Sequence, residues 1–240
     1  MNYWLFIALA SAILSALAAI FQKKVLFNLN ALEFSFILSV FNLIIALILF
    51  PQMDMSKICF DGLIILYFKT ILGAIAFLNV MLAIKNLEIS SALPLMTLTP
   101  AIVVILSFII LGESISGIEF LGMLILLMGT YVLELRKKDN LIDPIKTLIK
   151  TNYHRYIFYA LILLSVSSVI DKLIIKDFNL SPFNFVVFQQ IFLAINFTII
   201  ILIKLKNPIE ILKKVSKDNL AWIILISVLT IGYRYTQIEA

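Results

Sequence analysis

The chain has 240 residues, of which 62% are hydrophobic and 14% are charged, and its mean hydropathy is +1.10. A soluble domain is about half apolar and about a quarter charged, so this composition excludes water as the main solvent of the chain. The formal charge of +5 does not indicate nucleic-acid binding, because the basic residues lie in polar connections between apolar runs, where a topology bias explains them.

Apolar runs about as long as a bilayer is thick follow one another along the chain. A helix needs about 20 apolar residues to cross a membrane, and only helices satisfy their own backbone polar groups within lipid at this composition. The sequence therefore predicts an all-α, multi-pass integral membrane protein of an inner or plasma membrane. The eight predicted transmembrane helices cover residues 3–21, 32–50, 62–84, 91–111, 117–135, 156–174, 183–203 and 219–238.

The two longest polar connections are residues 136–155 and 204–218. Each is expected to hold a short amphipathic helix at the membrane surface, over residues 144–150 and 208–217. Because most of the Lys and Arg residues lie in these connections, the positive-inside rule predicts that both are cytoplasmic and that the N-terminus is outside.

A weak internal repeat relates the first predicted helix to the sixth. The matching residues are LAAIFQK at 17–23 with VSSVIDK at 166–172, and Asn28, Leu29 and Phe34 with Asn179, Leu180 and Phe185. If the repeating unit has five helices, the second unit begins on the opposite face of the membrane, so the two units are expected to be related by inversion. The predicted domains are a first five-helix repeat (1–135), a central polar loop (136–155) and a partial second repeat of three helices (156–240).

One stretch of the sequence resembles a known transporter domain. Its matching residues are AIKNL at 83–87, SALP at 91–94, LTPA at 98–101, LGES at 111–114, FLG at 120–122 and MG at 128–129. Together they resemble the end of an EamA domain, from the drug/metabolite transporter superfamily. The similarity covers essentially the whole chain and is strongest between residues 69 and 135.

The resemblance implies ten helices in two inverted five-helix repeats around a central cavity. It also implies secondary transport of a small metabolite, amino acid or drug-like solute by alternating access. With about eight of the ten helices present, the chain is expected to lack the last two after Ala240. The alternative is therefore a non-transporting membrane assembly partner or an inactive truncated fragment, and the coding sequence past codon 240 would distinguish these.

Several residues of the EamA-like stretch have structural explanations. Pro94 and Pro100 are expected to kink helices on the side of the cavity, since carbonyls that a proline leaves without a partner are tolerated only against protein or water. Glu113 is expected to cap the helix that follows it. The glycines Gly122 and Gly129, with Gly117, are expected to permit close packing of helices rather than to contact solute.

Lys69 and Arg234 are the two cations placed well inside predicted helices. An ionisable group within lipid is costly and by default marks a pathway or pairs internally. Because the third and eighth helices correspond in the repeat, the two cations would suit an anionic or zwitterionic solute. The alternatives are snorkelling of Lys69 to the membrane surface and an ion pair of Arg234 with Glu239 or Asp171.

Polar residues near these cations complete the predicted site. Interhelical hydrogen bonding is the commoner use of amides within spans, and this applies to Gln189, Gln190, Asn42 and Asn196. Gln189 and Gln190 rank above the others because they are adjacent, so at least one of them is expected to face protein rather than lipid. The predicted solute-binding residues are Lys69, Asn79, Gln189, Gln190, Tyr233, Arg234 and Gln237.

Enzymatic chemistry has no visible basis in the sequence. A single cysteine, Cys59, and a single histidine, His154, argue against a disulfide framework and against Cys-rich or His-based metal sites. No Ser-His-Asp set, nucleotide-binding glycine loop or HExxH motif is present, so no catalytic residue, metal or cofactor is expected. The expected partners are a small-molecule solute and membrane lipid, with a homodimer as an open alternative and no nucleic acid.

Overall fold

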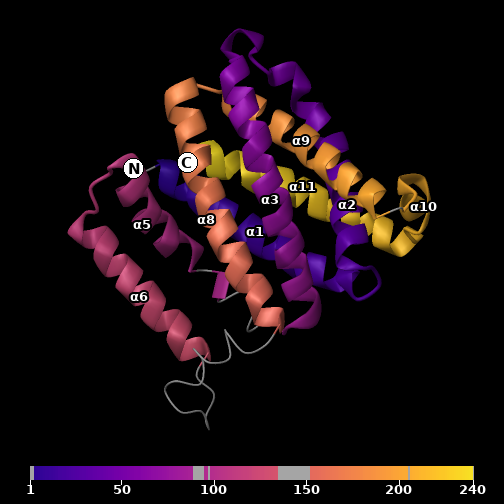
Figure 1. Cartoon of the computed structure of the whole chain (residues 1–240), viewed down its shortest axis with the longest axis horizontal. Helices are drawn as coiled ribbons and strands as arrows, with labels where there is room; N and C mark the ends of the chain where they lie inside the picture. The colour runs from indigo at the N-terminus through magenta and orange to yellow at the C-terminus, as the bar shows by residue number, and fades with distance from the viewer. Residues whose placement is uncertain (1–2, 89–94, 97, 135–151, 205, 240) are drawn as a thin grey trace. The chain divides into compact units, whose positions relative to one another are not determined.

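The computed structural model describes residues 3–88, 95–96, 98–134, 152–204 and 206–239. In these ranges the chain forms helices and no strand (Figure 1), so the all-α expectation is confirmed. The helices are α1 (Tyr3–Leu26), α2 (Ala31–Ala46), η1 (Leu47–Gln52), η2 (Met55–Lys57), α3 (Phe60–Asn86), α5 (Thr99–Leu111), α6 (Gly117–Glu134), α8 (Asn152–Phe178), α9 (Pro182–Ile203), α10 (Pro208–Lys213) and α11 (Lys217–Glu239).

Six helices of the described ranges are long and apolar enough to cross a membrane, and the two others that were predicted to do so are shorter. The shorter ones are α5 and α6, which lie within the predicted spans 91–111 and 117–135. Their lengths of 13 and 18 residues correspond to about 20 and 27 Å. Residues 89–94 of the first of these spans lie outside the described residues.

The ends of the long helices extend beyond the predicted apolar runs. Helix α8 begins at Asn152, inside the connection predicted for residues 136–155, because a helix continues into the polar interface where hydropathy no longer marks it. Of the amphipathic helix predicted for residues 208–217, the structure contains the shorter helix α10 over residues 208–213. The one predicted for residues 144–150 lies outside the described residues.

Large apolar side chains are exposed along most of the long helices. Ile13 of α1, Ile109 of α5 and Met128 of α6 are 54%, 69% and 69% exposed. Contiguous apolar surface of this extent is not found on a soluble monomer, whereas lipid accepts it without cost. The exposed faces are therefore the lipid-facing surface of a multi-pass membrane protein.

The described residues form two compact units. The first contains residues 1–74 and 173–240, and the second contains residues 75–172. Helices α3 and α8 pass from one unit into the other. Each unit thus combines segments from both of the predicted sequence repeats.

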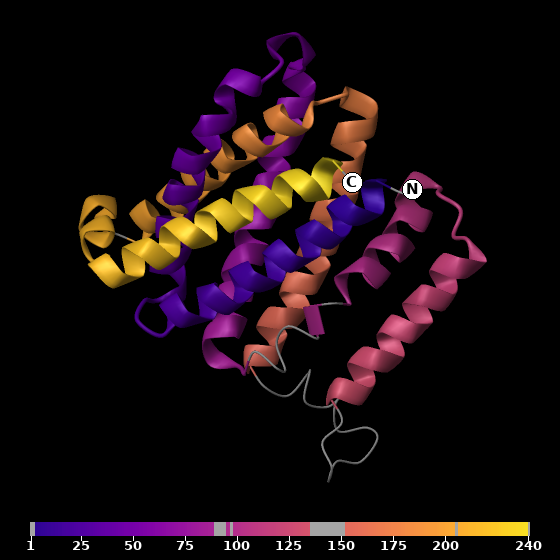
Figure 2. The same cartoon turned by 180° about the vertical axis from the view of Figure 1, so that it is seen from behind.

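In the first unit, α1 and α11 pack along most of their lengths (Figures 1 and 2). The hydroxyl of Ser11 donates to the carbonyl of Tyr233 at 2.9 Å. Near the other end of the pair, the Phe21 ring lies 5.0 Å from the Trp222 ring, and Lys24 lies 3.9 Å over that indole. The small residue Gly232 allows close approach, since an added Cβ would meet Leu14 at 3.4 Å.

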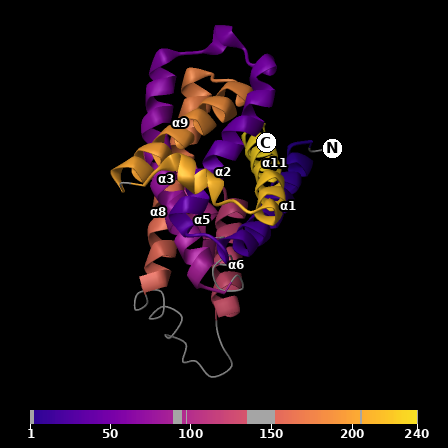
Figure 3. The same ribbon diagram turned by 90° about the vertical axis from the view of Figure 1, so that its right-hand side faces the viewer.

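Helices α2 and α9 also pack together, and the segment after each one contacts the start of the other. Lys206 and Lys214, which follow α9, donate to the carboxylate of Glu33 at the start of α2 at 3.0 and 3.4 Å. The connection after α2, the purple arch in Figure 3, contains Asp54. The backbone N–H and C=O of Asp54 bond the Asn184 amide at 3.1 and 2.7 Å. The two helices therefore run antiparallel.

The turn between α5 and α6 in the second unit explains the Leu-Gly-Glu sequence. Gly112 ends α5 with a φ of 65°, a left-handed conformation that favours glycine. The expectation that Glu113 caps α6 is wrong, because its carboxylate forms an ion pair with Lys172 of α8. Instead, Ser116 and Glu119 cap α6 reciprocally, with N–H to oxygen distances of 2.8 and 3.3 Å, which is a capping box.

Candidate functional site

The first unit has a polar interior. Its buried residues include a lysine, two glutamines and three asparagines from α2, α3 and α9, in addition to hydroxyl residues. Burying such groups away from water is costly unless they bond one another or face a polar pathway. The described interior of this unit is therefore the candidate site.

Lys69 of α3 is 1% exposed, so its ammonium does not reach the membrane surface and the snorkelling alternative is wrong. Its Nζ lies 2.6 Å from the amide oxygen of Gln189 on α9 and 5.1 Å from the centroid of the Phe185 ring. Phe185 and Gln189 are one helical turn apart on α9. One face of α9 thus holds the ammonium through an amide dipole and an aromatic ring.

Arg234 of α11 contacts the same amide oxygen. Its Nη2 lies 2.6 Å from the Gln189 oxygen, and its Nη1 donates to the Gln237 side-chain oxygen at 3.1 Å. The Gln189 amide is assigned with its oxygen toward the two cations, since the reverse orientation would set its NH₂ against two donors. Arg234 forms no ion pair in the described part of the chain, so pairing with Glu239 is not seen.

The shared oxygen fixes the separation of the two cations. Two atoms that each lie 2.6 Å from one oxygen are at most about 5 Å apart, which corresponds to a repulsion of roughly 3 kcal/mol at an effective dielectric constant of about 20. Gln189 is neutral and supplies only a dipole. A guanidinium has five N–H donors, so the two bonds of Arg234 within the described residues leave donors for an anionic group.

The rest of the predicted site is only partly in this cluster. Gln190 is 1% exposed and its side-chain oxygen has no partner among the described residues. Tyr233 contributes its carbonyl to Ser11 rather than its side chain to the cations. Asn79 belongs to the second unit, where its amide donates to the Ile75 carbonyl of its own helix at 2.8 Å.

Two residues next to the cluster of Lys69, Gln189 and Arg234 were not among the predicted site residues: Thr70 and Phe185. Thr70, which is fully buried beside Lys69, accepts a hydrogen bond from the Asn196 amide at 3.2 Å, so the interhelical role expected for Asn196 is confirmed. In the sequence, Phe185 stands out only as a marker of the repeat. Its position one turn before Gln189 is the sequence signal that could have placed it in the site.

Pro100 lies in the first turn of α5, after a turn at Leu98. Pro100 therefore lies at the start of α5 and not inside it, where a proline costs no helical hydrogen bond, and the kink expected on the side of the cavity stays a prediction. The hydroxyl of Thr99 donates to the Met96 carbonyl at 2.8 Å, which satisfies a group that the proline nitrogen cannot bond. Pro94 lies outside the described residues.

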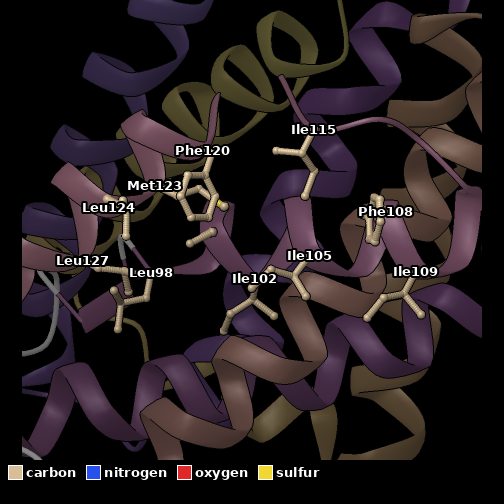
Figure 4. A pocket seen from close by; sticks show the side chains of 11 residues that line it. Leu98, Ile102, Ile105, Phe108, Ile109, Ile115, Phe120, Met123, Leu124 and Leu127 are labelled. Atoms are coloured by element: carbon tan, nitrogen blue, oxygen red, sulfur yellow. The ribbon is translucent and has the colours of Figure 1, made fainter. Parts of the chain in front are cut away.

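The second unit contains an apolar pocket of about 660 Å³ between α5 and α6 (Figure 4). Its lining residues are Leu98, Ala101, Ile102, Ile105, Phe108, Ile109, Ile115, Phe120, Met123, Leu124 and Leu127. None of these side chains donates or accepts a hydrogen bond, so the pocket offers no means of orienting a polar solute. We therefore place the candidate site in the polar interior of the first unit.

The glycines of α6 do not mediate close helix packing in the described residues. A Cβ added at Gly117, Gly122 or Gly129 would meet no atom within 4 Å, so that expectation is wrong for the described contacts. A different glycine has this role in the first unit, since a Cβ on Gly62 would lie 3.1 Å from the Cβ of Phe178. Among the described residues, no group of three His, Cys, Asp or Glu side chains could hold a metal ion.

Comparison with known proteins identifies the family. The model of the EamA-like transporter family matches residues 2–135, which run from α1 to the end of α6 and make up more than half of the chain. No protein of curated function matches the chain. The lipid-facing surface, the Leu-Gly-Glu turn at Gly112 and the family match agree, and the chain belongs to the EamA-like transporter family.

Proposed function

We propose that the chain is a secondary transporter of the cell membrane that carries a small anionic or zwitterionic solute by alternating access. Lys69 and Arg234 bind the anionic group of the solute, and Gln189 sets their positions. The observation that carries this proposal is the amide oxygen of Gln189, which brings an ammonium and a guanidinium within at most about 5 Å of each other.

An anionic group placed between these cations would relieve their repulsion and use the remaining donors of Arg234. Carboxylate and phosphate oxygens match the planar donor geometry of a guanidinium. This combination favours organic anions and amino-acid-like zwitterions over cationic drugs.

The inverted repeat is part of the same proposal. Phe34 and Phe185 are both fully buried and lie at equivalent places near the starts of α2 and α9. The residue before each phenylalanine, Glu33 or Asn184, bonds the segment that follows the other helix. A pair of antiparallel helices with such reciprocal contacts is what an inversion axis between the repeats would produce.

Uptake by proteoliposomes that contain the purified chain tests the function. The solutes are labelled organic anions, zwitterionic amino acids and cationic drugs. We expect uptake of anions or zwitterions, and Lys69→Met should lower it at least about tenfold because one of the two anion-binding charges is lost. Lys57→Met, which removes an exposed lysine paired with Asp54, is the matched control and should leave uptake unchanged.

A second variant tests whether Arg234 binds the solute, by changing its hydrogen-bond partner Gln237. Gln237→Glu places a carboxylate next to Arg234, which would compete with the solute for the guanidinium. We expect weaker solute binding with the fold intact. Uptake of cationic drugs alone, or anion uptake that survives both Lys69→Met and Gln237→Glu, would overturn the proposal, and no uptake by the wild-type chain would favour the assembly-partner alternative.

A further inference from the structure

Four buried side-chain oxygens in the first unit have no hydrogen-bond partner among the described residues. They are Asn42 Oδ1 of α2, Gln190 Oε1 of α9, and Ser227 Oγ and Thr230 Oγ1 of α11. Each of the four residues is at most 6% exposed. A buried polar atom without a partner is costly. The four atoms lie on three mutually packed helices, so they are candidate ligands for a species bound between these helices.

The helix register places three of these residues at one depth. Ala46, Val186 and Ile231 pack together where α2, α9 and α11 meet. Asn42 lies one turn before Ala46, Gln190 one turn after Val186 and Ser227 one turn before Ile231. These residues come from the three different helices, and Thr230 lies three residues after Ser227, about four-fifths of a turn from that level.

The helix directions make these displacements coincide. Helix α9 is antiparallel to α2, because Lys206 after the end of α9 bonds Glu33 at the start of α2. Helix α11 is parallel to α2, because the Asn28 amide just before α2 bonds Asn219 in the first turn of α11 at 3.3 Å. Asn42 and Ser227, one turn before the apolar contact, therefore lie on the same side of it as Gln190, which is one turn after it on the antiparallel helix.

The two hydroxyls differ from other helical hydroxyls of the chain. A serine or threonine in a transmembrane helix usually donates to a carbonyl of the preceding turn. Ser35, Ser39, Thr70, Thr130, Ser165, Thr198 and Thr236 all do so, at 2.7 to 2.9 Å. Ser227 and Thr230 make no such bond, so their oxygens are available to an occupant of the interior.

The chemistry of the four atoms limits that occupant. All four are neutral oxygens. Hard cations take oxygen ligands, and Ca²⁺ and Mg²⁺ sites are usually built with carboxylates, none of which belongs to this set. We propose that Asn42, Gln190, Ser227 and Thr230 bind one monovalent alkali cation in the interior of the first unit.

The proposed alkali-cation site lies close to Lys69 and Arg234, so binding at the two places should be coupled. This coupling rests on the proposed function. Arg234 is one turn after Thr230, and Gln190 is adjacent to Gln189, so the alkali cation would lie within about 10 Å of two positive charges. Repulsion at that distance weakens cation binding on the order of tenfold per charge. A bound anionic solute removes this repulsion, so solute and alkali cation bind cooperatively.

Binding of ²²Na⁺ to the purified chain in lipid nanodiscs tests the site without any solute. We expect about one Na⁺ per chain, displaced by unlabelled Na⁺ but not by choline, and an unfolding midpoint that rises with NaCl at constant ionic strength. Gln190→Leu and Ser227→Ala should each abolish both effects. Ser39→Ala and Thr198→Val are the matched controls, because their hydroxyls bond their own helices.

Lys69→Met tests the repulsion between Lys69 and the bound cation. Structural damage would weaken Na⁺ binding, whereas the loss of this repulsion should strengthen it. Loss of its charge should tighten Na⁺ binding about tenfold even though anion uptake falls. Equal unfolding midpoints in NaCl, KCl and choline chloride with no bound ²²Na⁺ would overturn the proposal and assign the four oxygens to buried water. If ²²Na⁺ binds but no anion is transported, the cation site stands and the proposed solute is wrong.

Discussion

The two compact units bury different kinds of polar group. In the first unit, the amide of Gln189 joins α3, α9 and α11 by bonding Lys69 and Arg234. In the second unit, the Thr130 hydroxyl returns to a carbonyl of its own helix, and the pocket between α5 and α6 is apolar. The Ser165 hydroxyl bonds the Leu161 carbonyl of its own helix at 2.7 Å and reaches the Thr99 carbonyl of α5 only at 3.4 Å. Polar groups that bond between helices hold those helices in one register, whereas groups that bond within a helix leave its packing to shape alone.

The largest expected effect is at Gln189. Gln189→Leu removes the acceptor that two buried cations share, and we expect a loss of about 3 kcal/mol in the free energy of unfolding together with loss of uptake. Gln189→Glu should act in the opposite sense on stability, because a carboxylate neutralises part of the repulsion, while it blocks the anion site. Denaturant unfolding and uptake are the measurements, and Thr198→Val on the same helix is the control. Equal stability of all variants would contradict the role of the cluster.

The contacts between α2 and α9 should have the next largest effect. Glu33→Gln and Asn184→Leu each remove the bonds that one helix start makes with the segment after the other helix, and each should cost about 1 to 2 kcal/mol of unfolding free energy. The two sites lie at opposite ends of the helix pair, so the double variant should show the sum of the two losses. A double variant no less stable than either single one would mean that the two contacts do not act independently.

Glycine substitutions should change sign between the units. Gly62→Ala should lower the free energy of unfolding by about 1 to 3 kcal/mol, because its Cβ would lie 3.1 Å from that of Phe178. Gly122→Ala and Gly129→Ala meet no described neighbour and should raise it by about 0.5 kcal/mol through helix propensity. Thermal unfolding in nanodiscs compares them. Destabilisation by Gly122→Ala would show that α6 packs against a further surface.

The smallest effect is expected at the ion pair of the second unit. Lys172 and Glu113 have side chains that are 51% and 30% exposed, and exposed pairs contribute about 0 to 1 kcal/mol. Glu113→Gln should therefore change the free energy of unfolding by about 0.5 kcal/mol or less, and the change should shrink further at high salt. If Glu113→Gln lowered the free energy of unfolding as much as Gln189→Leu does, the exposed charges of the second unit would matter as much as the buried charges of the first.

Much of the fold is predictable from the sequence because lipid imposes a simple rule on it. Apolar runs of about 20 residues have to be helices, so each predicted span contains a helix where the chain is described. The ends were less predictable, since α8 begins at Asn152 in a segment too polar for hydropathy to mark. The start of α5 at Thr99, whose hydroxyl bonds the Met96 carbonyl, is likewise not marked by an apolar pattern.

The site was predictable in part for a similar reason. Lys69 and Arg234 stand out because charges are rare within apolar runs, and the adjacent glutamines stand out as amides within an apolar helix. The sequence contains no sign that both cations meet at one oxygen of Gln189, because this contact depends on the relative rotation of three helices. Ser227 and Thr230 are no different in type from the hydroxyl residues that bond their own helices, so sequence reasoning passed over them.

The reciprocal contacts of α2 and α9 have a consequence for motion. Each helix start is tied to the chain that leaves the other helix, through Glu33 at one end and Asn184 at the other, so sliding or separation of the pair would break bonds at both ends together. A transport cycle needs some helices to move while others stay fixed. We expect the amide hydrogens of α2 and α9 to be among the last to exchange with solvent, with rearrangement confined to helices that have no such double attachment.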